Sequence, residues 1–299
     1  AEVGVLLAAW AVRDPLAPAP LAFRVRRAEV RLAGRPLEHW GYALSLDPTY
    51  AGILKDGYVS YHREDWFRFQ VGQMKVPVSA EFLRDGGNLD TVERARFASA
   101  AATRDFGYMR DIGMLAVLSA RIGKAWLGAY NGAGDNVAAN APYNSFVGRL
   151  ELTPFGEALT LGGSYLYGYK KSSDAAGKTT EGTRARYGGN ADLKLGKLRL
   201  GGEALSGYDN WKTNSQALGL VGQALYAVLP DQDVLVRVEG WNPDGSVTGT
   251  NSLQEWSAGL GWTYRIGGTG TRIQVNYFHD FLPRNVVDDR LLTSFALQL

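Results

Sequence analysis

The regular alternation of apolar and polar residues in many short segments most constrains what this 299-residue chain can fold into. In Thr271–Tyr277 every second residue from Ile273 is apolar, and the residues between them are polar. The pattern continues to the end of the chain, where Phe295, Leu297 and Leu299 are spaced in the same way. A period of two residues is that of a β-strand with one apolar and one polar face. The chain is therefore predicted to be all-β.

Sixteen such segments can be counted, and two kinds of connection alternate between them. The candidate strands lie near residues 2–12, 22–33, 38–46, 53–62, 66–73, 109–121, 124–131, 143–153, 158–168, 183–194, 197–206, 216–228, 233–241, 252–265, 270–279 and 290–299. The even connections are tight, such as Ile122-Gly123 and Leu195-Gly196, and the odd ones are longer and polar, such as Lys170–Gly182. Short turns at one end and long loops at the other are typical of outer-membrane barrels, whose strands need about ten residues to cross the bilayer. We predict a single transmembrane antiparallel β-barrel of 16 strands over residues 1–299.

The average composition hides this pattern. The mean hydropathy of −0.17 is that of a soluble protein, and no run approaches the ~18 apolar residues of a membrane helix. The longest apolar run, Val3–Val12, is interrupted by Gly4 and lacks the basic flank of a signal sequence, so we expect the chain to begin as a mature protein does. Trp and Tyr, 23 residues together, fall mostly near the ends of the proposed strands, as the aromatic girdles of a membrane barrel would.

A soluble β-sandwich, a lipocalin-like barrel or a propeller is the alternative fold. A soluble sheet would pack its apolar face as a core, whereas the polar faces here hold repeated arginine and glutamate that a dry core would not accept. No repeat of 40–50 residues supports a propeller. The membrane barrel is therefore the preferred interpretation.

Charge and cysteine content exclude several classes of function. The chain has no Cys, which excludes a disulfide scaffold and a thiolate metal site. Lys and Arg number 32 against 30 Asp and Glu, so bulk charge cannot attract nucleic acid and any basic site must be local. We find no metal-ligand pattern and no phosphate-cradling glycine loop, and we expect neither a metal nor a cofactor.

One connection, residues 74–108, is much longer than the others. A loop of this length is usually functional, and a barrel of 16 strands is wide enough for an aqueous channel. We expect this third outer loop to fold into the lumen and narrow it; the alternative is an exposed extracellular loop. Its charges are evenly mixed. The charged residues in the loop are Lys75, Glu81, Arg84, Asp85, Asp90, Glu93, Arg94, Arg96, Arg104 and Asp105.

Several segments, in order along residues 22–135, resemble the phosphate-selective porin O and P family. The matching segments are Arg26–Leu32 (RRAEVRL), Asp56–Tyr61 (DGYVSY), Phe67–Phe82 (FRFQVGQMKVPVSAEF), Thr91–Arg94 (TVER), Arg110–Gly113 (RDIG) and Gly128–Gly132 (GAYNG). The resemblance implies a trimeric outer-membrane porin of 16 strands with a constricting third loop. It also implies a basic lumen that passes phosphate or other anions.

The candidate site residues are basic side chains on the barrel wall and in the long loop. The resemblance points to Arg26, Arg27 and Lys75, while strand alternation turns Arg27 and Arg31 into the lumen. The same alternation turns Arg26 and Arg24 outward unless a β-bulge resets the register. The complete set of candidates for an anion path is Arg26, Arg27, Arg31, Arg68, Lys75, Arg84, Arg94, Arg96 and Arg104. Arginine suits this role because it stays charged and offers a fork of donors to an oxyanion.

Acidic residues share the inner face and reduce the expected preference. Alternation sends inward the carboxylates Glu151, Asp192, Glu203, Glu239 and Glu255. It also sends inward the arginines Arg149, Arg184, Arg186, Arg199, Arg237, Arg265, Arg272 and Arg290. We therefore expect a channel that leans weakly toward anions, with a dedicated phosphate site less favoured.

The predicted function is a passive diffusion channel for small hydrophilic solutes in the outer membrane of a Gram-negative bacterium. Its expected partners are the lipid bilayer, small anions and two further copies of the chain in a homotrimer, and not nucleic acid. The alternative is a plugged or structural barrel that anchors partner proteins. An enzyme is not expected. Of the three histidines, His39 and His62 lie at predicted periplasmic turns, and His279 has no serine at a matching outward position for nucleophilic catalysis.

Overall fold

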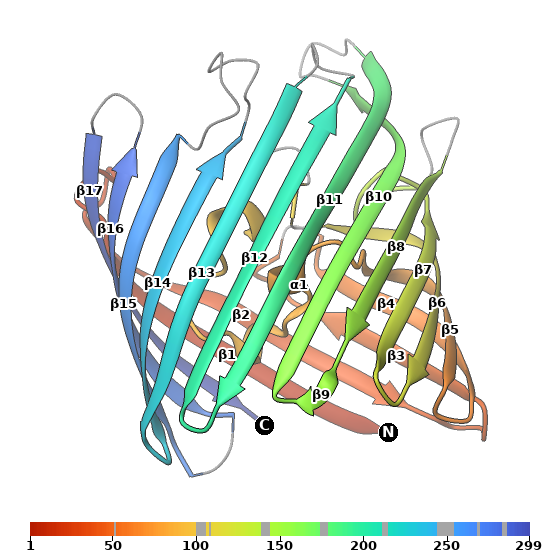
Figure 1. Ribbon diagram of the computed structural model, residues 1–299, viewed down its shortest axis with the longest axis horizontal. Coiled ribbons are helices and arrows are strands. Elements are labelled where there is room, and N and C mark those ends of the chain that lie inside the picture. The colour runs from red at the N-terminus through yellow and green to blue at the C-terminus, as the bar shows by residue number, and fades with distance from the viewer. Residues whose placement is uncertain are drawn as a thin grey trace.

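In the computed structural model, the described residues form a closed antiparallel barrel of 16 strands (Figure 1). The described residues are 1–50, 52–99, 106–107, 109–138, 144–173, 179–210, 215–243, 254–267, 270–282 and 286–299. The barrel strands are β1 (Glu2–Arg13), β2 (Leu21–Gly34), β3 (Trp40–Leu46), β4 (Leu54–Arg63), β5 (Phe67–Lys75), β6 (Arg110–Ala120), β7 (Gly123–Tyr130), β8 (Ser145–Leu152), β10 (Leu159–Ser173), β11 (Thr179–Leu195), β12 (Leu198–Asp209), β13 (Ser215–Leu229), β14 (Gln232–Asn242), β15 (Glu255–Arg265), β16 (Arg272–Leu282) and β17 (Val286–Gln298). The predicted fold class and strand number are confirmed.

Every barrel strand pairs with its neighbours in chain order, and β1 closes the ring by pairing with β17 from Leu6↔Gln298 to Arg13↔Leu291. Closure leaves no sheet edge, so the backbone amides of the spanning strands find partners within the barrel instead of facing hydrocarbon unpaired. A further short strand, β9 (Pro154–Glu157), lies in the turn between β8 and β10. The chain ends N and C lie on the side of the short turns, as Figure 1 shows.

Alternation along the strands separates an apolar outer face from a polar inner face. In β14, Val236 is exposed while the next residue, Arg237, is only 1% exposed. Phe23 and Phe146 are likewise exposed on the outer face, whereas Arg149 is buried. This arrangement is the reverse of a soluble barrel, because the exposed apolar side chains belong to the face that meets lipid.

Aromatic pairs gather where strands meet the short turns. Trp40 and Tyr61 pack edge-to-face across β3 and β4 with ring centroids 5.3 Å apart. Trp262 and Tyr264 stack at 6.2 Å near the end of β15. The expected placement of aromatic residues near strand ends is therefore observed at these positions, where amphipathic rings suit the membrane interface.

The hairpin of β10 and β11 is longer than the sequence predicted. Residues 158–168 and 183–194 were expected as strands, with a loop at Lys170–Gly182, but the ladder continues through Lys171↔Glu181 to Ser173↔Thr179. Most of these added residues are polar. The predicted loop was therefore too long, because the alternation of apolar and polar residues that marks a strand in the sequence is absent there. Residues 174–178 of the predicted loop lie outside the described residues.

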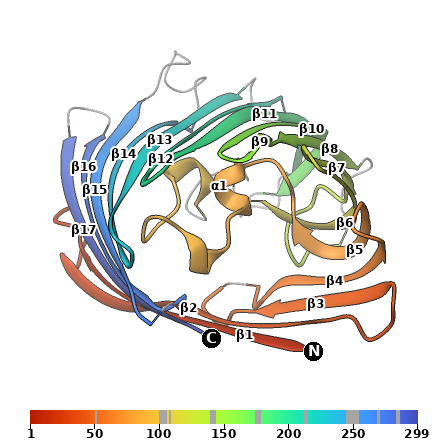
Figure 2. The ribbon, with the colours of Figure 1, turned by 60° about the horizontal axis from the view of Figure 1, so that its bottom comes forward.

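The segment between β5 and β6 contains three short helical turns, α1 (Ala80–Leu83), η1 (Gly86–Asn88) and η2 (Arg96–Ala98). The strands surround α1 in the view of Figure 2. Among the described residues, no helix is long and apolar enough to cross a membrane.

Two clusters of buried apolar side chains join this segment to the inner wall. In the larger cluster, loop residues pack with wall residues; it contains Met74, Val76, Val78, Phe82, Ala95, Phe97, Ala98, Phe106, Met109, Leu115, Val117, Tyr130, Val147, Leu166, Leu205, Ala217, Val221 and Trp241. In the smaller one, Val92 packs with Leu6, Ala8, Trp10, Phe278, Leu292 and Ala296. The expectation that the inner faces line water was therefore wrong for these strands. A signal was present in β6, where Met114 faces outward and Leu115 inward, so both faces are apolar.

Candidate functional site

A β-bulge in β2 determines how the first candidate arginines point. Ala8 of β1 pairs with Arg27, but Ala9 pairs with Val25, so Arg26 is the extra residue. A bulge shifts the alternation of faces by one residue. The default expectation that Arg26 faces outward was therefore wrong, and the bulge named as the exception is present.

Arg24 and Arg26 both lie over the indole of Trp10, each with its guanidinium carbon 5.2 Å from the ring centroid. Trp10 is buried in the smaller apolar cluster. Arg24 also forms an ion pair with Glu93 of the long loop at 3.6 Å. Both arginines therefore lie on the inner side of the wall, where cation–π contacts hold their charged groups.

Basic side chains from four strands and the long loop converge on one cavity of about 50 Å³, which we call the central cavity. Seven basic and three acidic side chains line it, a formal excess of four positive charges. The basic ones are Arg26, Arg27, Arg31, Lys55, Lys75, Arg94 and Arg110, and the acidic ones are Glu29, Asp47 and Asp85. The structure thus brings together five of the nine candidates from the sequence.

Sequence reasoning missed Lys55 and Arg110. Each stands at the loop end of a strand, where the alternation of apolar residues fades. Arg110 begins the family-like segment Arg110–Gly113, so a signal was present. Its guanidinium is held by Asp56, with Nε 3.0 Å and Nη2 3.2 Å from the two carboxylate oxygens.

Carboxylates hold several of the central cations in place. Arg31 forms ion pairs of 2.9 Å with both Glu29 and Asp85. Lys55 contacts Glu29 and lies 3.6 Å from Asp47. These pairs reduce the field of each cation but fix its position, so the excess of positive charge has a defined geometry.

Lys75 and Arg94 bind the carbonyl groups at the end of α1. Lys75 Nζ donates to the carbonyl oxygens of Leu83 and Arg84, both at 3.0 Å. Arg94 Nη2 donates to the Arg84 carbonyl at 2.6 Å. Lys75 also forms an ion pair with Asp85 at 3.5 Å. The carbonyl contacts therefore fix the positions of both cations at the edge of the central cavity.

Two larger cavities adjoin the central one. The outer cavity, of about 520 Å³, is lined by residues near the long loops, such as Asp14 and Leu282, and shares Arg94 with the central cavity. The inner cavity, of about 420 Å³, is lined by residues near the short turns, such as Ala33, and by residues of the long loop, such as Pro77. It shares Arg31, Lys75 and Asp85 with the central cavity. Each of the two larger cavities therefore has at least one basic side chain in common with the central one.

The outer cavity has the opposite charge balance. Its acidic side chains are Asp14, Glu93, Glu239, Glu255 and Asp288, and its basic ones are Arg94, Arg96 and Arg290. Among the described residues, no group of three or more His, Asp or Glu side chains is arranged to hold a metal ion.

The remaining candidates lie elsewhere. Arg84 binds Asp90 at 2.6 Å and Asp192 at 3.0 Å, and it lines a further cavity of about 370 Å³ near the turns. Arg96 lies in the outer cavity and Arg68 in the inner cavity. Arg104 falls outside the described residues.

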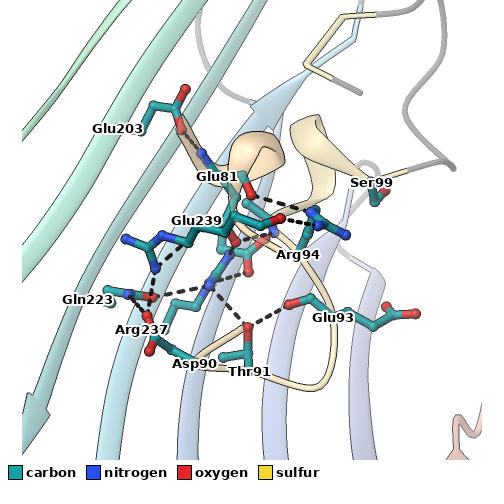
Figure 3. A network of polar contacts seen from close by, with 12 residues as sticks. Glu81, Asp90, Thr91, Glu93, Arg94, Ser99, Glu203, Gln223, Arg237 and Glu239 are labelled. Carbon is teal, nitrogen blue, oxygen red and sulfur yellow. Dashed lines mark hydrogen bonds and ion pairs between the residues drawn. The ribbon is translucent and has the colours of Figure 1, made fainter. Parts of the chain in front are cut away.

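A network of polar contacts fastens the long loop to the wall (Figure 3). The carboxylate of Glu203 on β12 accepts hydrogen bonds from the backbone N–H groups of Ala80, at 2.9 Å, and Glu81, at 2.7 Å. Arg237 on β14 is fully buried and donates to Glu81 at 2.8 Å and to Glu239 at 2.7 Å. The loop is therefore bound by charge-assisted hydrogen bonds as well as by apolar packing.

Acid is expected to loosen this network in a defined pH window. Burial alone would raise the pKa of Glu81, but the Arg237 and Arg84 guanidiniums outweigh it and lower the pKa from 4.5 to about 2. The stabilisation is therefore complete above about pH 4.5 and lost as the pH falls toward 2. We expect current fluctuations to grow below about pH 4, as Glu81 becomes protonated and its ion pair with Arg237 is lost.

The control for this pH dependence is the variant Glu93→Gln, which changes a more exposed carboxylate of the same loop. It should keep the acid window, whereas Glu81→Gln should fluctuate at neutral pH as the wild type does in acid. Steady current in Glu81→Gln at neutral pH would contradict the assignment to Glu81.

Comparison with known proteins agrees with this architecture. A family model described as phosphate-selective porin O and P matches residues 15–195. OmpT of Vibrio cholerae is similar in structure, with a TM-score of 0.68, 10% identity and coverage of 100% of this chain and 97% of that one. The outer membrane channel DcaP of Acinetobacter baumannii has a TM-score of 0.68 and 10% identity, with coverage of 100% and 96%.

OmpF of Salmonella typhi, solved in complex with daunomycin, has a TM-score of 0.70 and 12% identity, with coverage of 100% of this chain and 97% of that one. At these identities the likeness concerns the fold. A search of curated proteins finds no match. The porin family and the porin-like neighbours together suggest a channel and not an enzyme. Because the family model spans more than half of the chain, this protein belongs to the phosphate-selective porin O and P family and is a diffusion channel of the bacterial outer membrane.

Proposed function

We propose that this channel passes small hydrophilic solutes with a modest preference for anions. The observation that supports the preference is the central cavity, where seven basic side chains face three acidic ones. It is also the smallest of the three adjoining cavities. An excess of positive charge at the narrowest part of a path raises the local concentration of anions most effectively.

The long connection, residues 74–108, is proposed to form the constriction inside the lumen. Its described part contacts inward-facing side chains on widely separated strands, including Glu203 on β12, Arg237 on β14 and Asn276 on β16. A segment that reaches the inner faces of several distant strands must cross the space between them. Several cavities remain beside it, and the central cavity is the one where the loop meets β2, β4, β5, β6 and the connection between β3 and β4.

A dedicated phosphate trap is less favoured than weak anion preference. Arg31, Lys55 and Arg110 already have carboxylate partners, so a phosphate would compete with charges that are present. The acidic outer cavity also lowers the positive potential along the approach. Phosphate therefore belongs among several permeating anions in this proposal.

A homotrimer is proposed as the assembly. A structure of Vibrio cholerae OmpT described as a trimer form has a TM-score of 0.69 to this chain. Chemical crosslinking of the detergent-solubilised protein tests the proposal, and a ladder that stops at the dimer would contradict it.

The decisive experiment is a planar-bilayer recording in a KCl gradient. We expect an ohmic channel whose reversal potential shows a few-fold higher permeability for chloride than for potassium. A reversal potential at zero or on the cation side would overturn the anion preference. An absence of conductance would instead favour the alternative function, a structural barrel that anchors partner proteins.

A further inference from the structure

Part of the wall of the inner cavity is apolar, and inorganic ions that pass through a channel gain nothing from contact with such a surface. Its volume of about 420 Å³ falls within the ~300–1,000 Å³ of typical small-molecule sites. Tyr58 on β4, Trp126 on β7 and Leu83 at the end of α1 form much of that wall. A cavity that combines apolar surface with a few polar groups is the usual arrangement for binding an organic molecule.

The rings of Tyr58 and Trp126 pack against the barrel interior on one side and line the inner cavity on the other. Tyr58 and Trp126 are only partly buried, and both pack against the larger apolar cluster inside the barrel. The Arg149 guanidinium lies 5.9 Å from the centre of the Trp126 ring. Held in this way, the rings offer a fixed apolar surface to the cavity.

Basic groups occupy the part of the inner cavity that adjoins the central one. Arg31 and Lys75 line both cavities. Arg68 on β5 also lines the inner cavity, and its Nε is buried with no hydrogen-bond partner within the described part of the chain. Two carboxylates line the same cavity, and both already pair with other cations: Asp85 with Arg31 and Lys75, and Asp56 with Arg110. Among the described residues, Arg68 forms no ion pair with a carboxylate. The Arg68 side chain as a whole is only partly buried, so its positive charge is available to an anion in the cavity.

We propose that the inner cavity binds organic anions that join a carboxylate to an apolar ring, a class represented by simple aromatic monocarboxylates. The carboxylate would accept hydrogen bonds from Arg68 with Arg31 and Lys75 nearby, and the ring would pack against Tyr58, Trp126 and Leu83. This inference rests on the proposed channel function, and it adds the class of solute that the channel retains.

Size and chemistry distinguish this class from inorganic anions. Phosphate or chloride has no apolar surface to pack against the wall, so the wall would stay in contact with water. An aromatic carboxylate would remove its own ring and the apolar wall from water while keeping its charge beside the guanidinium groups. The solute would therefore be held beside the central cavity, with which the inner cavity shares Arg31 and Lys75.

Block of chloride current by benzoate, compared with acetate, tests the proposal. The two anions share a carboxylate and differ in the ring. We expect benzoate to half-block the current at a concentration at least about tenfold lower than acetate, because the ring buries apolar surface. Calorimetric titration of the detergent-solubilised protein with both anions gives the same comparison without any current.

Three variants locate the site. Leu83→Asn should lower the ratio of benzoate to acetate affinity by about threefold or more, because it removes apolar surface from the wall. Arg68→Gln should weaken both anions alike and leave the ratio unchanged. The matched control, Leu16→Asn, changes a leucine that lines the outer cavity and should alter neither affinity.

Equal affinities for benzoate and acetate would overturn the proposal. If Leu83→Asn disturbs the loop, Tyr58→Ser provides a second removal of apolar surface, and an unchanged ratio in that variant would place the site elsewhere. The reversal potential in KCl is measured without either carboxylate. A failure of anion preference is therefore distinguishable from a failure of benzoate binding.

Discussion

Replacing Arg237 by methionine is expected to release the long loop from the wall and to raise the single-channel conductance. Arg237 is buried between Glu81 and Glu239 and also donates to Thr91 Oγ1 at 3.1 Å. Removing one partner of a buried ion pair costs about 3–5 kcal/mol, because the remaining charges lose their compensation. Here two carboxylates on the loop and wall would be left facing each other, and bilayer recordings should show larger, fluctuating currents.

The barrel itself should survive this substitution, because its strands are held by backbone ladders that do not involve the Arg237 side chain. A difference in gel mobility between heated and unheated samples of the variant in detergent would show that its barrel is still folded. Arg265→Met is the matched control on the neighbouring strand β15, because Arg265 is 43% exposed and pairs with Asp233 of the wall. Exposed pairs contribute about 0–1 kcal/mol. Wild-type conductance in Arg237→Met would contradict the proposal that this network holds the constriction closed.

Neutralising Arg27 and Arg94 together is expected to remove most of the preference for anions. Both line the central cavity, so the double variant Arg27→Gln with Arg94→Gln halves its formal excess of four positive charges. Arg94 also lines the acidic outer cavity, whose negative balance becomes stronger. Two unit charges within several ångströms of a permeating ion change its energy by about 1 kcal/mol or more in a wet lumen. The chloride-to-potassium permeability ratio should therefore fall about three- to tenfold.

A second double variant distinguishes the effect of the total charge of the protein on selectivity from the effect of the charge in the central cavity. Arg63→Gln with Arg121→Gln removes the same net charge from exposed residues near the short turns, and it should leave the reversal potential close to the wild-type value. The effect of the central pair should also shrink between 0.1 M and 1 M KCl, because the Debye length falls from about 10 Å to about 3 Å. Equal shifts from the two double variants would show that bulk charge, and not the central cavity, decides selectivity.

The alternation of apolar and polar residues predicted the barrel because the outer face of each strand meets lipid and requires apolar side chains, whereas the inner face accepts polar ones. Val236 and Arg237 illustrate the point, since neighbouring residues have opposite exposure. Connection lengths then predicted which end holds the turns. The alternation is absent from Lys170–Ser173 and Thr179–Gly182, which nevertheless pair as strands.

The candidate site was predicted in part. Arg27 and Arg31 were assigned to the lumen by strand parity, and both line the central cavity. Arg26 was assigned outward, because a bulge of one residue leaves no mark in a hydropathy pattern. Lys55 and Arg110 were missed for a related reason, since residues at strand ends are positioned by their partners across the barrel.

By itself, the sequence determined the class of fold, the strand number and the lipid-facing surface, because these depend on residues close together along the chain. Only the tertiary structure decided how the inner surface is divided between an apolar cluster and the charged cavities. It also decided which cations meet in the central cavity and which bind carboxylates elsewhere, as Arg84 does with Asp192. The physical reason is distance along the chain. The contacts that matter join the long loop to strands more than a hundred residues away, such as Ala80 with Glu203, and no local pattern encodes such a pairing.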